Sequence, residues 1–409
     1  MYLMVSHIPV YVDGSRYYTD INWQRDLVLA RDWLARPFGG LKLLAPSLPL
    51  EAADPAAMKL SPIGVDDEIH VVPSIDPRRL ATEFWLRQRR QWLGDVQREL
   101  HQADVIHASA CCNYRPLGFL AHNAGIRAGV PTVFVGPDMD PHVTMSVNIK
   151  GRLYCMVFDR LMRQALNSSS LALLKEGLVY DRYAKYGKNA KAFCHSMYSK
   201  LDVLDETLLE KRLETLRQDR PLRAVYAGRF VPRKGLRDSM AAISKARRLG
   251  MDVEYHLYGS GPEVDSLRRL AAELDIKDLV HFHGFVEYSA QFITELATYD
   301  LLLFMPTEED TPRMLYDAMA AGLPLVGSRI PFLEHRIKSD QMGVLVDIGD
   351  SLATAEQLLH LCNEPERLKF LSRSALTGGK CHSSEEWYRR RAEWTQQAVE
   401  RHKSDRGIL

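Results

Sequence analysis

The residues best suited to bind a diphosphate lie between Ala227 and Asp350. A glycine turn, Gly228–Gly235, follows an apolar run and carries Arg229 and Lys234. Two cations on one turn can share the charges of a diphosphate, and backbone N–H groups at such turns bind anions without a side chain. The turn therefore predicts a phosphate-binding loop, although both cations could also be solvated surface residues.

A second glycine turn follows the expected strand Val253–Tyr258 and includes Gly259 and Gly261. Pro262 comes next and suits the first position of a helix, where its missing N–H costs nothing. We expect this turn to contact phosphate as well.

Two acidic residues, Glu309 and Asp317, follow an expected strand and are eight positions apart. Eight helical residues make a little over two turns, so both carboxylates can act along one line of the expected helix Arg313–Ala321. One could bind a sugar and the other a ribose. Alternatively, both could be acids that offset the dipole at a helix N-terminus.

In their order, these motifs resemble the retaining glycosyltransferase family 4 of the GT-B fold. The resemblance covers roughly Arg223–Asp350. The matching segments are Gly228-Arg229, Lys234-Gly235, Gly259 to Pro262, Phe282 to Phe285, Glu309 to Asp317, and Ala318 to Pro324.

The resemblance implies a retaining, metal-independent transfer from a nucleotide-diphosphate sugar, which is a substrate, so no cofactor is expected. It implies front-side attack, in which the departing phosphate oxygen takes the acceptor proton. The implied catalytic residues are Arg229, Lys234 and Glu309. The implied nucleotide-binding residues are Gly228, Gly259, Gly261, Phe285, Thr311, Pro312 and Asp317.

Two positions depart from the family pattern. Asp317 stands where the family usually has Glu, and its side chain is one methylene shorter. Asp310 and Thr311 stand where the family usually has Gly and an aromatic residue. We expect Asp317 to reach a ribose hydroxyl still, whereas Asp310 should change the local geometry around the phosphates.

Length and alternation predict the organisation. At 409 residues the chain is longer than a single core usually supports. Strands alternate with helices, which indicates parallel sheets. Together with the resemblance to family 4, this implies the predicted fold class α/β: GT-B, with two Rossmann-like doubly wound parallel-sheet domains facing across a cleft.

The resemblance implies an acceptor-binding domain over residues 1–205 and a nucleotide-sugar domain over 206–380. It also implies that a helical segment over 381–409 returns to the first domain. The charged stretch Leu204–Arg220 is the predicted linker.

The first domain offers weaker signals for the acceptor or donor-sugar side. Pro137 stands where the family often has His, and Asp138 keeps the adjacent acid. His142 could replace the missing donor-sugar contact, or it could be a surface-loop histidine. Gly14 lies in a loop that could border the acceptor, and His107 fits a structural position at a strand end.

Composition excludes several classes of protein. A net charge of +1 gives no electrostatic footprint for nucleic acid. The six cysteines lack Cys-x-x-Cys spacing, which favours reduced thiols and argues against a zinc site. His7, Pro9 and Asp13 interrupt the N-terminal segment, so we expect no signal peptide. No window holds about 18 uncharged apolar residues, so we expect no membrane-spanning helix. The predicted localisation is cytoplasmic.

Peripheral contact with the inner membrane face is one interpretation of Arg78–Leu100. This stretch combines the arginines Arg78, Arg79, Arg87, Arg89 and Arg90 with the apolar residues Phe84, Trp85, Trp92 and Leu93. A basic amphipathic helix can lie on an anionic membrane. An ordinary helix with arginines outward and aromatic residues in the core has the same pattern, and we favour it.

The predicted function is sugar transfer from a nucleotide-diphosphate sugar to a hydroxyl of a sugar or lipid-linked acceptor, in polysaccharide or glycoconjugate synthesis. Two alternatives remain. One is a nucleotide-sugar epimerase or phosphorylase of the same fold. The other is a non-catalytic nucleotide-binding relative.

Overall fold

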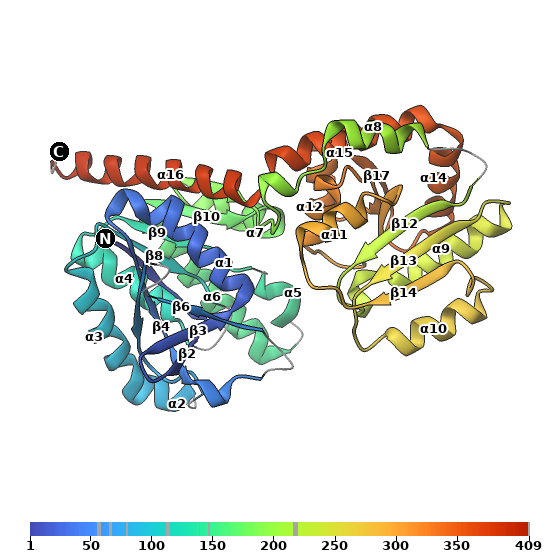
Figure 1. The fold of residues 1–409 in the computed structure, drawn as a ribbon. Helices are drawn as coiled ribbons and strands as arrows, with labels where there is room; N and C mark the ends of the chain where they lie inside the picture. The colour runs from blue at the N-terminus through green and yellow to red at the C-terminus, as the bar shows by residue number, and fades with distance from the viewer. Residues whose placement is uncertain are drawn as a thin grey trace. The chain divides into compact units, whose positions relative to one another are not determined.

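The computed structural model describes residues 1–54, 59–64, 68–78, 81–111, 115–138, 140–145, 148–215 and 220–407. The chain divides into two compact units (Figure 1). Unit 1 contains Met1–Phe193 and Trp387–Leu409, and unit 2 contains Cys194–Glu386.

Unit 1 is built on a seven-stranded sheet whose order is β11-β10-β9-β8-β1-β4-β7, with every pair parallel. Its strands are β1 (Tyr2–Val5), β4 (Leu41–Ala45), β7 (Ile69–Pro73), β8 (Val105–Ser109), β9 (Thr132–Val135), β10 (Leu171–Lys175) and β11 (Ala190–Phe193). The strands are apolar and largely buried, as expected for a parallel sheet covered on both faces. A smaller sheet, which sequence reasoning missed, has the order β5-β2-β3-β6. It contains β2 (Val10–Asp13), β3 (Arg16–Asp20), β5 (Ser47–Pro49) and β6 (Leu60–Ile63).

Apart from the C-terminal helix, the α-helices in the described part of unit 1 are α1 (Ile21–Leu29), α2 (Ala81–Glu83), α3 (Arg89–Leu100), α4 (Leu117–Ala128), α5 (Pro141–Met145), α6 (Ile149–Ser168) and α7 (Leu178–Tyr183). Helices α3, α4 and α6 bury apolar residues in the core. Phe84, Trp92 and Phe158 belong to the core they form with the sheet. His107 is buried and bonded to the Tyr2 hydroxyl at 2.7 Å, and burial lowers its pKa to about 3, so it is structural.

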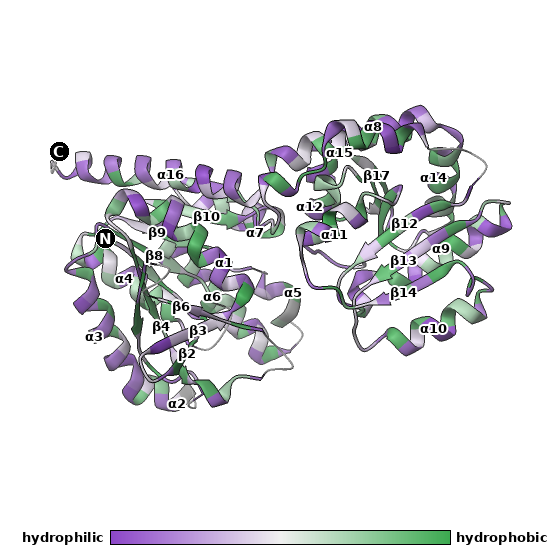
Figure 2. Ribbon diagram, in the orientation of Figure 1, coloured by the Kyte–Doolittle hydropathy of each residue, from purple (hydrophilic) through white to green (hydrophobic). Residues whose placement is uncertain are grey.

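Helix α16 (Ser384–Asp405) packs along unit 1. Trp387 and Tyr388 are buried, and the Tyr388 hydroxyl donates to the Asp26 carbonyl at 3.0 Å. The Arg391 guanidinium lies 5.3 Å from the centre of the Phe193 ring. Figure 2 colours α3 and α16 largely purple, as expected for helices with one wide solvated face.

Unit 2 has a six-stranded parallel sheet with the order β14-β13-β12-β15-β16-β17. Its strands are β12 (Leu222–Ala227), β13 (Val253–Tyr258), β14 (Val280–Gly284), β15 (Leu301–Phe304), β16 (Leu325–Ser328) and β17 (Gly343–Val346). Its helices are α8 (Glu206–Glu214), α9 (Leu236–Arg248), α10 (Val264–Glu273), α11 (Ala290–Leu296), α12 (Arg313–Ala320), α13 (Pro331–Asp340), α14 (Ser351–Asn363) and α15 (Pro365–Cys381). Counted along the chain, the strand order is 3-2-1-4-5-6, the dinucleotide-binding arrangement.

Both units therefore have the Rossmann-like doubly wound parallel sheet that the sequence predicted. Two local predictions were wrong. The stretch Leu204–Arg220 is not a separate linker in its described part, because α8 packs Leu209 and Leu213 against Leu376 of unit 2. Pro262 does not begin a helix, since α10 starts at Val264 with Glu263 as its N-cap.

The cysteines placed by the structure, namely Cys111, Cys155, Cys194, Cys362 and Cys381, are free thiols. Cys112 lies outside the described residues. None of the helices in the described part of the chain combines the length and hydropathy that a bilayer crossing requires.

Candidate functional site

The sheet of unit 2 reverses its strand order between β12 and β15. At such a point the connections leave the two strands in opposite directions, and ligands bind outside the carboxyl ends of the strands. Gly228 directly follows β12, and the segment with Glu309 and Asp310 follows β15. The topology therefore places both predicted motifs at the same position of the sheet.

The two glycine turns lie directly against each other. The Gly228 N–H donates to the Tyr258 carbonyl at 2.9 Å, and the Phe230 N–H donates to the Ser260 carbonyl at 2.8 Å. A side chain at Gly259, whose φ is 136°, would place its Cβ 1.9 Å from the Gly228 carbonyl oxygen. Only glycine fits here, so the loops after β12 and β13 form one backbone surface.

A third close approach involves Gly235, which has a φ of 67° and precedes α9. A Cβ on Gly235 would lie 1.5 Å from the Met305 carbonyl oxygen. The Thr307 N–H also donates to the Arg233 carbonyl at 3.1 Å. The cationic turn is thereby fixed against the loop that follows β15.

Lys234 forms an ion pair with Asp310, and Arg233 contacts the same carboxylate at 3.1 Å. The Lys234 and Asp310 side chains are only 12% and 9% exposed. Burial lowers the pKa of Lys234, and the Asp310 charge opposes that shift. A carboxylate of the chain itself thus neutralises one of the cations predicted for the diphosphate.

Arg229 is exposed and takes no part in that pair. Its carbonyl accepts from the Tyr226 hydroxyl at 3.2 Å, and that contact holds its backbone rather than its side chain. Sequence reasoning overlooked Arg233, since it counted only Arg229 and Lys234. Arg233 directly precedes Lys234, and this adjacency was the available signal.

Glu309 and Asp317 have different surroundings. A Glu309 carboxylate oxygen is 3.5 Å from the Phe332 N–H in the first turn of α13, so this acid also faces a helix N-terminus. Asp317 is buried in α12, and its Oδ1 has no hydrogen-bond partner among the described residues. Burial raises the pKa of Asp317 from 3.8 to about 7. A buried acceptor of this kind suits a ligand that brings hydroxyl donors.

The remaining predicted nucleotide contacts surround these groups. Pro312 is the N-cap of α12, and Thr311 beside it is half-buried. Phe285 follows β14 and is 76% exposed. Gly261 packs on Phe230, since a Cβ there would lie 2.4 Å from the Phe230 carbonyl oxygen.

The predicted residues of unit 1 lie in different elements, and Asp138 and His142 contact different described residues. Gly14 lies in the exposed turn between β2 and β3. Asp138 is exposed and pairs with Lys175 at 2.8 Å. His142 contacts the Asp159 carboxylate at 3.0 Å, and Asp159 also accepts from the Tyr183 hydroxyl.

Unit 1 also contains a candidate that the sequence did not suggest. Its strand order reverses between β1 and β8. His7 lies just beyond β1, and its ring contacts the hydroxyl of Ser109 at the end of β8, at 3.3 Å. Burial lowers the pKa of His7. The position of His7, two residues after the first strand, could have indicated this candidate from the sequence.

The basic segment Arg78–Leu100 of unit 1 contains both buried and exposed apolar side chains. Phe84 and Trp92 are buried, as the core interpretation predicted. Trp85 and Leu86, however, are 49% and 78% exposed. The neighbouring Arg87, Arg89 and Arg90 are exposed as well, while Arg79 lies outside the described residues.

Comparison with known proteins identifies the family of the second unit. The model of the glycosyl transferases group 1 family matches residues 209–376. N-acetyl-alpha-D-glucosaminyl L-malate synthase of Bacillus anthracis is 29% identical over 162 residues, which are 40% of this chain and 41% of that protein. Lipopolysaccharide core biosynthesis glycosyltransferase LpsE of Rhizobium meliloti is 32% identical over 124 residues, or 30% of this chain and 34% of that protein. These alignments thus span less than half of either relative.

Solved structures match over nearly the whole chain. HepE of Anabaena in complex with UDP has a TM-score of 0.66 at 15% identity, covering 97% of this chain and 99% of that one. WaaG, a glycosyltransferase involved in lipopolysaccharide biosynthesis, has a TM-score of 0.59 at 13% identity, covering 96% and 99%. At such identities the likeness establishes the fold, which is GT-B.

Replacing Asp317 with Asn is expected to stabilise the protein at alkaline pH. The folded-state pKa of about 7 lies above the ordinary 3.8, so the folded chain holds a proton that the unfolded chain has lost. Stability should therefore fall as pH rises from about 4 to about 7, by up to roughly 4 kcal/mol, and Asp317→Asn should remove this loss.

Thermal unfolding at pH 5 and pH 8 measures the effect, with Glu308→Gln at an exposed acid as the control. The advantage of Asp317→Asn should be larger at pH 8. An equal difference at both pH values would show that the Asp317 carboxyl titrates normally.

Proposed function

Because residues 209–376 form a glycosyl transferases group 1 domain and the fold is GT-B, we propose that the protein is a retaining glycosyltransferase using a nucleoside-diphosphate sugar. The observation that supports the proposal is the close packing of the Gly228 and Gly259 turns at the reversal point of the unit 2 sheet, with Lys234 next to Gly235, which packs on the Met305 carbonyl.

The diphosphate would bind against the backbone surface formed by Gly228 and Gly259. Arg229 and Lys234 would stabilise the charge that develops on the leaving group, so metal-independent transfer is proposed. Arg233 would assist, since it shares Asp310 with Lys234. Electrostatic stabilisation by fixed groups of this kind commonly contributes a factor of about 10²–10³ to turnover.

Asp317 would accept hydrogen bonds from the ribose hydroxyls, and Glu309 would orient the hydroxyls of the donor sugar. The acceptor oxygen would attack the anomeric carbon on the face from which the diphosphate leaves. The bond from that carbon to the phosphate oxygen breaks, and the same phosphate oxygen takes the acceptor proton. Configuration at the anomeric carbon is retained.

The donor and acceptor proposals draw on the relatives. HepE of Anabaena has been crystallised with UDP-glucose, which makes a UDP-sugar the first donor to test. Relatives named for lipopolysaccharide core and colanic acid biosynthesis favour a hydroxyl on a growing polysaccharide or glycoconjugate as acceptor.

Binding of the diphosphate requires Lys234 to exchange the Asp310 carboxylate for phosphate. Asp310 would therefore compete with the donor, and would hold the buried ammonium in place while no donor is bound. The Asp310 charge would therefore lower the affinity for the donor diphosphate while keeping Lys234 in the site.

Two substitutions test this exchange. Lys234→Ala should lower UDP-sugar turnover by about 10²–10³. Asp310→Asn should tighten UDP binding by about tenfold, the effect of roughly 1.4 kcal/mol of lost competition. Calorimetric titration with UDP and release of UDP from UDP-glucose measure the two effects, with the exposed Lys277→Ala as control.

Near-normal turnover by a folded Lys234→Ala variant would exclude the proposed role of Lys234. Weaker UDP binding by Asp310→Asn would show that Asp310 positions Lys234 rather than competing with phosphate. Binding of UDP without any donor consumption would favour a non-catalytic relative, and an epimerised donor would favour an epimerase.

We also propose peripheral contact with an anionic membrane through Trp85 and Leu86. These two exposed apolar side chains lie beside three exposed arginines. Apolar burial combined with attraction to anionic headgroups is the usual basis of interfacial binding.

Co-sedimentation with vesicles containing phosphatidylserine tests this contact. The double variant Trp85→Ala, Leu86→Ala should lose most of the binding, whereas Leu249→Ala, an exposed apolar position of unit 2, should not. Equal binding by both variants, or no binding by the unaltered chain, would contradict the proposal.

A further inference from the structure

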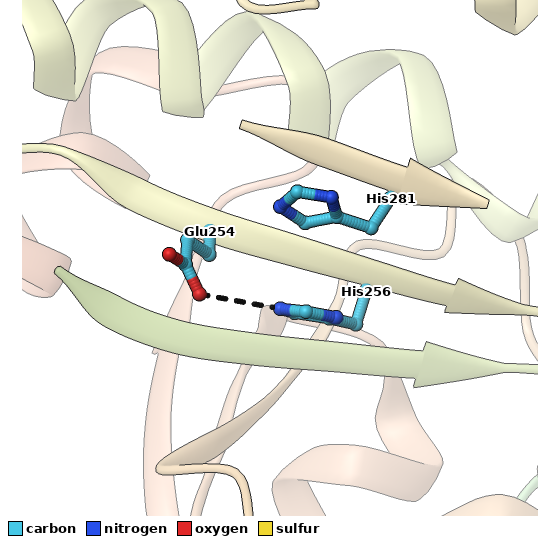
Figure 3. Close-up of side chains that lie close together, drawn as sticks. All are labelled: Glu254, His256 and His281. Atoms are coloured by element: carbon cyan, nitrogen blue, oxygen red, sulfur yellow. Dashed lines mark hydrogen bonds and ion pairs between the residues drawn. The ribbon is translucent and has the colours of Figure 1, made fainter. Parts of the chain in front are cut away.

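A cluster of metal-ligating side chains lies on one face of the unit 2 sheet. Glu254 and His256 are two residues apart on β13, so their side chains point to the same face. His281 on β14 is the direct cross-strand partner of His256. Figure 3 shows the three side chains together, with the Glu254 carboxylate directed at the His256 ring.

The distances suit a single ion. One ligand atom from each of the three residues can be chosen so that all lie within 4.8 Å of one another. His256 Nε2 is 3.4 Å from a Glu254 carboxylate oxygen. Ligand atoms around a tetrahedral zinc ion lie about 3.3 Å apart. The His256 and His281 rings are stacked, with their centres 4.6 Å apart and their planes inclined by 30°, so one ring has to turn before both nitrogens face one ion.

A fourth residue fixes the orientation of His256. Its Nδ1 lies 3.0 Å from His283 Nε2. When Nδ1 carries the proton and donates to His283, the lone pair of Nε2 faces Glu254 and is available to a metal. Ligating histidines almost always have such a partner on the other ring nitrogen.

The surroundings keep this partner rigid. The His283 ring stacks on Tyr258, with the ring centres 4.4 Å apart and the planes inclined by 10°. The Tyr258 hydroxyl in turn contacts the Tyr299 hydroxyl at 2.7 Å and donates to Glu295. The contacts that orient His283 are therefore present without a bound ion.

Among the described residues, Arg223 also pairs with Glu254, at 3.5 Å, and would compete with a metal. The Arg223 guanidinium also donates to the Thr298 carbonyl at 3.0 Å and lies over the Tyr299 ring. Because these contacts hold Arg223 on their own, Glu254 can turn to a metal without leaving the arginine unpaired.

We propose that Glu254, His256 and His281 bind a divalent transition metal, with Zn²⁺ as the expected ion. Two imidazoles and one carboxylate form a set that zinc accepts, leaving a fourth position for water. The ion would tie the edge strand β14 to β13. It takes no part in sugar transfer, since Glu254 is about 16 Å along the strand from Gly259.

A bound ion would also restrain the backbone beside the candidate donor site. Strand β14 ends at Gly284, whose carbonyl accepts from the Gly259 N–H at 2.6 Å, and Phe285 follows. A metal cross-link would hold this edge strand, and with it the segment beside the second glycine turn.

Metal binding to the full chain, purified without a histidine tag, tests the proposal. We expect one Co²⁺ per chain with the visible absorption bands of a tetrahedral site, and displacement of Co²⁺ by Zn²⁺. Zn²⁺ should also raise the unfolding temperature by mass action. His281→Ala should abolish the bands, and His283→Gln should weaken Zn²⁺ binding about 10–100-fold.

The matched control is His101→Ala, an exposed histidine of unit 1. It should bind Co²⁺ as the unaltered chain does. His281 is partly exposed, so its variant should unfold at the metal-free temperature of the unaltered chain. The proposal is overturned if the unaltered chain shows no tetrahedral bands, or if His281→Ala retains them.

Discussion

Close backbone approach at the carboxyl ends of β12, β13 and β15 is the constraint on which the candidate donor site depends. Gly259 packs on the Gly228 carbonyl and Gly235 on the Met305 carbonyl, at distances that leave no room for a Cβ. Three loops from separate parts of the chain thus become one surface. That packing positions the backbone N–H groups of the two glycine turns and Lys234, which are proposed to contact the donor.

Buried ionisable side chains lie in the same segments as this surface, and their partners differ. Lys234 is nearly buried, and a buried ammonium without a partner would be costly. Asp310 supplies the partner and favours the charged form of Lys234. In the proposed function, the same carboxylate competes with phosphate. Asp317 shows the opposite arrangement: its carboxyl is buried, one of its oxygens has no hydrogen-bond partner among the described residues, and burial raises its pKa.

The sequence predicted what depends on local pattern. Alternating strands and helices were sufficient for the parallel sheets, and the ordered motifs, through their resemblance to family 4, for the GT-B fold. It could not predict the Lys234–Asp310 pair, which joins residues 76 positions apart. The cluster of Glu254, His256 and His281 was not predicted for the same reason, because His256 and His281 become neighbours only when β13 pairs with β14. The stretch Leu204–Arg220 was wrongly predicted to be a linker because most of its residues are polar or charged. Its Leu209 and Leu213 nevertheless pack against Leu376.

Amide hydrogen exchange of the full chain, with and without a bound nucleoside diphosphate chosen from UDP, GDP and ADP by thermal shift, tests the donor site most directly. Slower exchange is predicted within residues 228–235, 259–263 and 307–317, because these backbone segments would surround the phosphates and ribose. If none of the three nucleotides binds, or if a bound one leaves these segments unprotected and slows exchange elsewhere, the donor site does not lie at the reversal point of the unit 2 sheet.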